Sequence, residues 1–199
     1  MELLSPVRIR IVTPNNMNSI DIFIQNYFSL VRTDSLTGLM LFVTHLFDAS
    51  IYFAIIVFCV CLTIYLFRNL NYIILFISAL LFGAVTGYLL KSVFNVNRPL
   101  GGVIVEAGKS FPSNHAIIAT IFFIMLMYIF DDYFESTSRI IFNTLCVLGI
   151  LVVAFSRIYL GIHWTSDILG GLAIGTVVSY ISVVIFRYRN SMRHSGSML

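Results

Sequence analysis

Charged side chains are scarce in this chain of 199 residues. Asp, Glu, Lys and Arg make up 11% of it, hydrophobic residues make up 59%, and the mean hydropathy is +0.95. A soluble domain carries about twice that share of charge. The shortage excludes an ordinary soluble globular protein and predicts an all-α, polytopic membrane helix bundle. The net charge is only +3 and the basic residues are dispersed, so nucleic acid is not expected as a partner.

Cysteine is also scarce, and carboxylates do not cluster in the sequence. The three cysteines, Cys59, Cys61 and Cys146, lie in apolar runs without the spacing to histidine that metal sites show. This pattern predicts packing roles for them, and we expect no metal ion and no cofactor. Met1–Ser19 lacks the continuous apolar core of a signal peptide, so none is expected.

Long apolar runs are what the chain does have. Five of them are long enough to cross about 30 Å of hydrocarbon, or nearly so with tilt. Two shorter runs, Ile20–Val31 and Leu36–Phe47, flank four polar residues that a membrane centre would tolerate poorly, so they predict two interfacial amphipathic helices. We therefore expect an N-terminal segment (1–48), a transmembrane core (49–186) and a polar C-terminal tail (187–199). The five expected spans are residues 49–67, 72–95, 114–130, 139–156 and 165–186.

An odd number of spans places the two termini on opposite sides of the membrane. The loops at residues 96–113 and 157–164 then share the N-terminal side. Arginines close to span ends are more numerous on the opposite side. Because positive residues concentrate in cytoplasmic loops, this bias places the two loops on the outer face.

Three short motifs border these two loops. In the first, Lys91 and Arg98 are seven residues apart, so they share a helical face if the second span continues that far and ends at Pro99. By itself, this pair is more typical of cations at a span end that reach for lipid headgroups.

The second motif is Pro112-Ser113-Asn114-His115, directly before the apolar run Ala116–Phe130. A helix start leaves backbone N–H groups unpaired and favours an anion. Ser113 can donate its hydroxyl to that anion, and His115 can act on it as a general acid. Without the other motifs, a plain helix cap with an interfacial histidine explains the sequence as well.

The third motif holds Arg157, after Ser156, and the pair His163 and Asp167. Residues four apart lie on one helical face, so we expect the carboxylate to hold one ring nitrogen and to leave the other free to attack. Arg157 carries the planar fork that suits phosphate oxygens. A purely structural pair is possible, but burying it in a membrane costs free energy.

Together the three motifs resemble the type 2 phosphatidic acid phosphatase superfamily, whose pattern is K-x6-RP, PSGH and SR-x5-H-x3-D. Every spacing matches, and the resemblance covers residues 21–186. It implies that His163 is a nucleophile oriented by Asp167, that His115 is the acid, and that no metal is required. It implies phosphate binding by Lys91, Arg98, Ser113 and Arg157, and by the backbone of Asn114.

Two departures from the family pattern stand out. Asn114 replaces the usual glycine, and its side chain can narrow the pocket or add a hydrogen bond. Members commonly have six spans, and the first of these is not seen before Asp21. The first departure concerns the site, and the second concerns only the topology.

The resemblance implies an integral membrane phosphatase whose partners are the bilayer and a lipid phosphate substrate. Undecaprenyl diphosphate is the favoured substrate, and a bacterial inner or plasma membrane is the expected location. Phosphatidylglycerophosphate, phosphatidate and a lipid A phosphate are the other candidates. Two alternatives remain at this point, a lipid phosphotransferase that uses the same histidine and a non-catalytic lipid-binding or transport protein.

Some residues outside the motifs also carry expectations. The pairs Gly83 and Gly87, and Gly171 and Gly175, have the small-residue spacing of closely packed membrane helices. For Glu106, in the first loop, we expect a surface role.

Overall fold

The computed structural model describes residues 18–48 and 50–196. Within these ranges the chain forms α-helices and one 3-10 helix and contains no strand, which confirms the predicted all-α fold. The elements are α1 (Ser19–Val31), α2 (Asp34–His45), α3 (Ile51–Phe67), α4 (Leu70–Phe94), α5 (Asn114–Phe130), η1 (Asp131–Tyr133), α6 (Ser136–Tyr159) and α7 (Thr165–Gly196).

Four helices of the described part, α4 to α7, are long and apolar enough to cross a membrane. The fifth expected span corresponds to α3, which has 17 residues. At 1.5 Å per residue α3 is about 26 Å long, somewhat less than the hydrocarbon thickness. Helix α7 continues to Gly196, ten residues beyond the expected end of the last span, so most of the predicted polar tail is helical.

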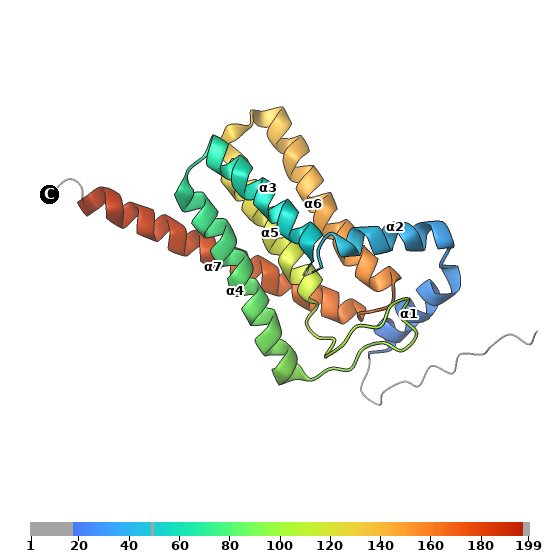
Figure 1. Cartoon of the computed structure of the whole chain (residues 1–199). Coiled ribbons are helices and arrows are strands. Elements are labelled where there is room, and N and C mark those ends of the chain that lie inside the picture. Colours follow the sequence, from blue (N-terminus) through green and yellow to red (C-terminus); the bar gives the residue numbers. More distant parts are fainter. Residues whose placement is uncertain (1–17, 49, 197–199) are drawn as a thin grey trace, which may run out of the picture.

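Helix α5 is the centre of the bundle and packs against α4, α6 and α7 (Figure 1). Its buried ridge repeats every four residues, as the α-helical period requires, and consists of Ile117, Ile121, Met125 and Ile129. On the neighbouring α4, the buried residues Phe76 and Ala79 belong to the same apolar cluster. The packing of this ridge positions α5 along the bundle axis, and with it the N-terminus of α5, where the second motif lies.

Glycines allow the helices to approach α5 closely. A Cβ atom on Gly171 of α7 would lie 2.8 Å from the carbonyl oxygen of Ser113, and one on Gly175 would lie 2.9 Å from that of Ile117. On α4, Gly83 and Gly87 face side chains of α5 in the same way. The predicted close packing at both glycine pairs is confirmed.

The outward faces of the long helices are apolar and exposed. Leu81 of α4, Leu148 of α6 and Val177 of α7 are each at least half exposed, with many neighbours of the same kind. Soluble monomers rarely show apolar surface on this scale. Helix length and surface together indicate a bundle that is embedded in a bilayer.

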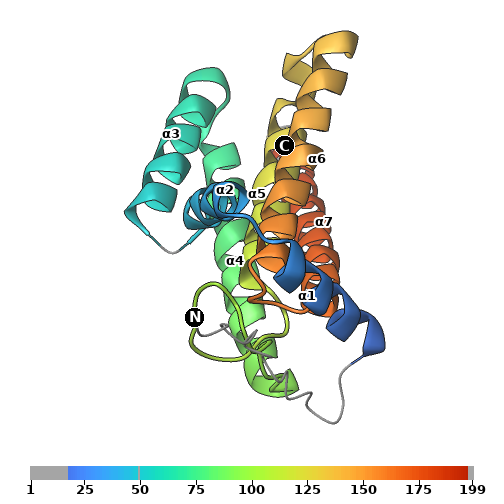
Figure 2. The same ribbon diagram turned by 90° about the vertical axis from the view of Figure 1, so that its right-hand side faces the viewer.

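The two motif loops, residues 95–113 and 160–164, meet at one end of the bundle, next to α1 and α2 (Figures 1 and 2). The predicted break between the N-terminal helices is confirmed at Arg32 and Thr33. Both helices pack on α6, where Met40 joins a buried cluster with Tyr159 and Leu160. Their position at a membrane interface stays a prediction, and the expectation about a signal peptide falls largely on residues outside the described part.

Candidate active site

His163 lies in the turn that joins α6 to α7. Helix α6 ends at Tyr159, Gly161 adopts a left-handed conformation with φ of +70°, and α7 begins only at Thr165. The expectation that His163 belongs to the helix is therefore wrong, because the glycine reverses the chain after α6. Its pairing with Asp167 holds all the same, since Asp167 lies in the first turn of α7 and points back toward the turn.

The carboxylate of Asp167 holds His163 by its Nδ1 atom. Oδ2 of Asp167 lies 3.3 Å from that nitrogen and accepts the backbone N–H of Trp164 at 2.8 Å. The hydroxyl of Ser110 donates to the same oxygen and lies 3.3 Å from His163 Nδ1. All of these side chains are buried. The partners assign the proton to Nδ1, because a carboxylate accepts but does not donate.

The other ring nitrogen of His163 is directed at a cation. Nε2 lies 3.1 Å from a guanidinium nitrogen of Arg98, which can only donate to it. Burial, followed by the charges of Arg157 and Arg98, holds the pKa of His163 well below its usual value. The imidazole is therefore neutral near pH 7 and has a lone pair on Nε2, which is the form that a nucleophile requires.

Arg98 reaches the site from a loop and not from a helix. Helix α4 ends at Phe94, and Asn95 caps it in the left-handed conformation, with φ of 52°. The helix does not continue to Pro99, so the condition under which Lys91 and Arg98 would share a helical face is not met; asparagine tolerates the left-handed cap that ends the helix. Hydrogen bonds to the carbonyl oxygens of Ile162 (2.9 Å) and Gly108 (3.3 Å) hold the Arg98 side chain.

Lys91 lies in the last turn of α4 and binds the backbone of the loop that precedes α5. Its Nζ atom donates to the carbonyl oxygens of Lys109 at 2.6 Å and Ser110 at 3.3 Å. The structure thus connects Lys91 to His163 through Ser110, whereas direct contact of this lysine with phosphate stays a prediction.

Arg98 and Arg157 converge on one carboxylate, that of Glu106. Oε2 of Glu106 lies 3.0 Å from Arg98, and Oε1 pairs with the fully buried Arg157, which also donates to Thr44. The expected surface role of Glu106 is wrong, since its side chain is only 22% exposed. Burial by itself would raise the pKa of Glu106, but the adjacent arginines lower it overall, so the group is an anion.

The second motif caps α5, as the sequence predicts. Ser113 is the N-cap residue: its Oγ accepts the N–H of Ala116 at 3.5 Å, and its own N–H donates to the carbonyl oxygen of Asp167 at 3.2 Å. The side chain of Asn114 lies against Gly87 of α4, where a Cβ atom would collide with it. Gly87 thus provides the space for an asparagine where the family pattern has glycine.

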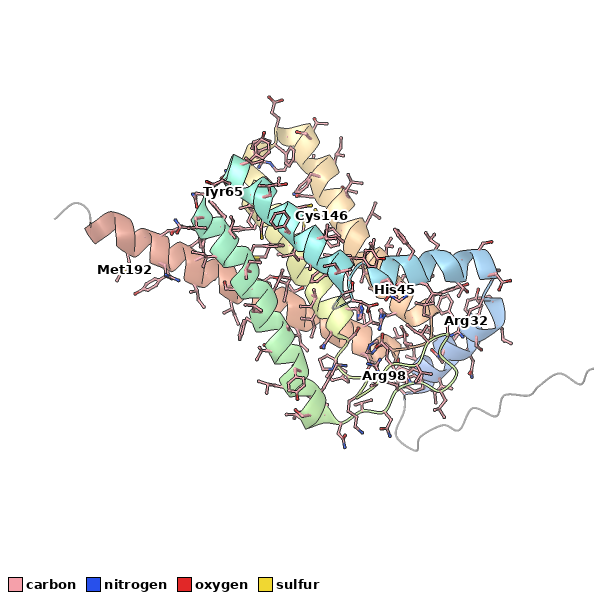
Figure 3. The ribbon with its side chains drawn as sticks, in the orientation of Figure 1. Arg32, His45, Tyr65, Arg98, Cys146 and Met192 are labelled. Atoms are coloured by element: carbon pink, nitrogen blue, oxygen red, sulfur yellow. The ribbon has the colours of Figure 1, made fainter. Side chains whose placement is uncertain are left out.

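His115, in the first turn of α5, is paired with a carboxylate that the motifs do not contain. Its Nε2 atom lies 2.7 Å from Oδ1 of Asp48, and the other carboxylate oxygen lies 2.7 Å from Nδ1 of His45. The hydrogen bond to His115, opposed by burial, lowers the pKa of Asp48 to about 2. Figure 3 shows His45 and Arg98 at this same end of the bundle.

Sequence reasoning missed four of the residues that complete this cluster, because they stand at no recognisable spacing from the motifs: Thr44, Asp48, Glu106 and Ser110. Donor atoms of Asp48, Glu106 and His115 lie within 4.8 Å of one another, a spacing that a metal ion could use. Glu106 is already engaged by two guanidinium groups, however, so the surroundings favour an anion over a cation. The cluster therefore defines a helical membrane protein in which two arginines and two histidines lie close together at one end of the bundle.

Comparison with known proteins identifies the family to which this helical membrane protein belongs. Residues 71–191, more than half of the chain, match the PAP2 superfamily, and the chain belongs to that family. The match includes the three motifs, nearly all of α4, the whole of α5 and α6, and most of α7.

Curated relatives in this family are distant. The chain is 27% identical over 125 residues to an undecaprenyl-diphosphatase of Sulfolobus acidocaldarius, a match that covers 59% of this chain and 54% of that protein. It is 27% identical over 81 residues to phosphatidylglycerophosphatase B of Bacillus subtilis, which covers 40% of each. The chain thus spans about half or less of the length of these relatives.

Solved structures show the same fold over most of the chain. The crystal structure of a transmembrane PAP2-type phosphatidylglycerolphosphate phosphatase from Bacillus subtilis has a TM-score of 0.79, with 23% identity and 89% of both chains covered. LpxE of Aquifex aeolicus has a TM-score of 0.67 at 20% identity, and 86% of this chain and 99% of that chain are covered. The chain is accordingly an integral membrane protein of the PAP2 fold.

Proposed function

We propose that the chain is a lipid phosphatase that hydrolyses a phosphate or diphosphate ester at the membrane surface through a phosphohistidine on His163. One observation carries the proposal: the two arginines Arg98 and Arg157 converge on a carboxylate beside Nε2 of a neutral histidine. A phosphate group that replaced the Glu106 carboxylate would meet the same two forks, which suit phosphate oxygens.

In the first step, Nε2 of His163 attacks phosphorus and the bond from phosphorus to the leaving oxygen breaks. Asp167 stabilises the positive ring that forms, because its carboxylate holds Nδ1–H. His115 gives a proton to the leaving oxygen, and the arginines stabilise the charge on the phosphoryl oxygens. In the second step, neutral His115 takes a proton from water, the water oxygen attacks phosphorus, and the phosphorus–nitrogen bond breaks.

The lipid tail would stay among the helices, whose outer faces are apolar, while the headgroup reaches the polar end of the bundle. Undecaprenyl diphosphate is our favoured substrate, because relatives from Sulfolobus acidocaldarius and Bacillus subtilis are named undecaprenyl-diphosphatases. Phosphatidylglycerophosphate is the next candidate, on the basis of phosphatidylglycerophosphatase B. We further propose a bacterial inner or plasma membrane, with the site on the outer face.

The test is phosphate release from purified undecaprenyl diphosphate, phosphatidylglycerophosphate and phosphatidate in detergent with EDTA present. We expect His163→Ala to lower kcat by about 1,000-fold or more, as loss of a nucleophile does, and to abolish an acid-labile phosphoenzyme. Arg157→Ala should lose most activity, whereas Arg139→Ala, far from the site on an exposed part of α6, should keep it. Activity unchanged in His163→Ala would refute the mechanism, and activity that disappears with EDTA would refute its independence of metal.

A further inference from the structure

Asp48 has both carboxylate oxygens directed at histidine rings. Oδ1 lies 2.7 Å from Nε2 of His115, and Oδ2 lies 2.7 Å from Nδ1 of His45. Asp48 follows α2 and precedes α3, so it approaches the N-terminus of α5 from a different part of the chain. The side chain of His115 is only 13% exposed and that of His45 is 57% exposed, so Asp48 connects an inner ring to an outer one.

We infer that Asp48 is a positioning residue for His115: it binds the Nε2–H group, favours the charged, proton-donating form of the ring, and leaves Nδ1 as the nitrogen for the leaving oxygen. The inference rests on the proposed function, since it assigns a partner to the general acid of that reaction. His45 holds the second oxygen of Asp48 and thereby fixes the orientation of the carboxylate.

The two histidines of the site are then supported in the same manner by different carboxylates. Asp167 contacts Nδ1 of His163, so that Nε2 is the nitrogen without a carboxylate, whereas Asp48 contacts Nε2 of His115, so that Nδ1 is the nitrogen without one. The charged groups beside the two rings differ in sign. His163 faces Arg98 and Lys91 and stays neutral, whereas His115 has the carboxylate of Asp48 in direct contact.

The charged groups around His115 come from three elements. They are Asp48 from the turn before α3, Glu106 from the loop before α5, and Arg157 from α6. Arg157 disfavours a positive ring, and Glu106 moves away from the arginines if phosphate replaces it. Asp48 is then the remaining carboxylate at the ring, so the charged form of His115 depends on it while substrate is bound.

The test compares two substrates that differ in the need for an acid. An alkyl phosphate has a poor leaving group that must be protonated, whereas 4-nitrophenolate leaves without a proton. For Asp48→Asn, which keeps the shape and removes the charge, we expect single-turnover release of an alkyl group to slow by about 10-fold to 100-fold, a part of what general acid catalysis contributes. Release of 4-nitrophenolate should slow less than about threefold on the same basis.

The pH profile provides a second readout that a merely structural role would not change. With the carboxylate removed, the positive ring loses its partner, so the alkaline limb of alkyl phosphate turnover should move to lower pH. Asp48→Glu keeps the charge, and its alkaline limb should stay within about half a pH unit of wild type. His115→Asn should show the same dependence on the leaving group as Asp48→Asn. Asp34→Asn, an exposed change in the first turn of α2, is the matched control.

The results separate the two proposals. If wild type forms no phosphoenzyme and releases no phosphate, the proposed function fails. If wild type is active but Asp48→Asn slows both leaving groups equally, or slows neither, the inference about Asp48 is overturned while the function stands. If Asp48→Asn does not fold, Asp48→Glu is tested with both substrates. An equal loss of rate with the alkyl and the 4-nitrophenyl phosphate then overturns the inference. Activity that requires added divalent cation through Asp48 would overturn it as well.

Discussion

Glu106 occupies the place that the proposed mechanism gives to a phosphate group. Its two oxygens are engaged by Arg98 and Arg157, one each, and its lowered pKa keeps it ionised. An anionic substrate therefore competes with an internal anion for the same guanidinium groups. The consequence concerns the affinity of the site for phosphate and not the chemistry on His163.

We expect Glu106→Gln to bind inorganic phosphate and orthovanadate about 10-fold more tightly, which corresponds to about 1.4 kcal/mol. The neutral amide competes less well for the arginines and leaves more positive charge at the site. The measurement is the inhibition constant of each anion with the alkyl phosphate substrate. Glu135→Gln, an exposed residue at the other end of the bundle, is the control. Equal or weaker inhibition of Glu106→Gln would contradict the competition.

The pH dependence of phosphoenzyme formation reports on His163. Because burial and the neighbouring arginines hold the pKa of His163 well below its usual value, Nε2 keeps its lone pair as the pH falls. Protonation, which would remove the nucleophile, begins only at a pH well below the ordinary value of about 6.5. We expect the rate of phosphoenzyme formation at saturating substrate, measured by rapid quench, to lack an acid limb near pH 6.5. An acid limb at that pH would show that the ring is not neutral.

At the scale of elements, α1, α2 and the turn after α2 contact the residues of the candidate site and their neighbours. Both oxygens of the buried Asp21, in α1, accept hydrogen bonds from Ser166, from its backbone N–H at 2.9 Å and its hydroxyl at 2.7 Å. Ser166 is the residue before Asp167, so α1 holds the first turn of α7. Thr44 and Asp48, from α2 and the turn after it, contact Arg157 and His115.

Loss of the Asp21 carboxylate should therefore affect both stability and activity. Asp21→Ala removes two part-buried hydrogen bonds from Ser166 to a carboxylate, and hydrogen bonds to charged groups contribute about 1.5 to 3 kcal/mol each. We expect a lower melting temperature in detergent and a reduced kcat, because Asp167 loses its support. The exposed Asp34→Ala serves for comparison. Wild-type stability and activity in Asp21→Ala would mean that α1 does not position the start of α7.

At the scale of the whole molecule, the arrangement places every motif at one end of the bundle and the turn with η1 at the other (Figure 1). This separation makes the orientation testable. In a variant whose three native cysteines are replaced by serine, Val105→Cys and Asp132→Cys provide exposed single thiols at the two ends.

With the site on the outer face, an impermeant maleimide should label Val105→Cys in intact cells and Asp132→Cys only after lysis. Labelling of Asp132→Cys alone in intact cells would reverse the proposed orientation. Labelling of both in intact cells would contradict a bundle that separates these ends across the membrane.

The sequence predicted what depends on local pattern: the helical class, the break at Arg32, the cap at Ser113 and the i, i+4 contact of His163 with Asp167. Hydropathy, capping chemistry and helical period act over short stretches, so they can be read from the residues. It failed at the left-handed Gly161, which places His163 in a turn and not in a helix, and it left open whether α4 continues from Asn95 to Arg98. The run of apolar residues does not reveal such an end.

Only the tertiary structure decided which side chains meet across the chain. Asp48 and His115 are 67 residues apart in the sequence, and Glu106 and Arg157 are 51 apart. Neither acidic residue stands at a spacing from which its partner could be predicted. Helix α2, which precedes the expected boundary at residue 48, packs on α6. The scarcity of charge determined by itself that this is a membrane protein, since few ions can be buried in hydrocarbon. Where those few ions pair depends on how the helices pack, and that is a property of the fold.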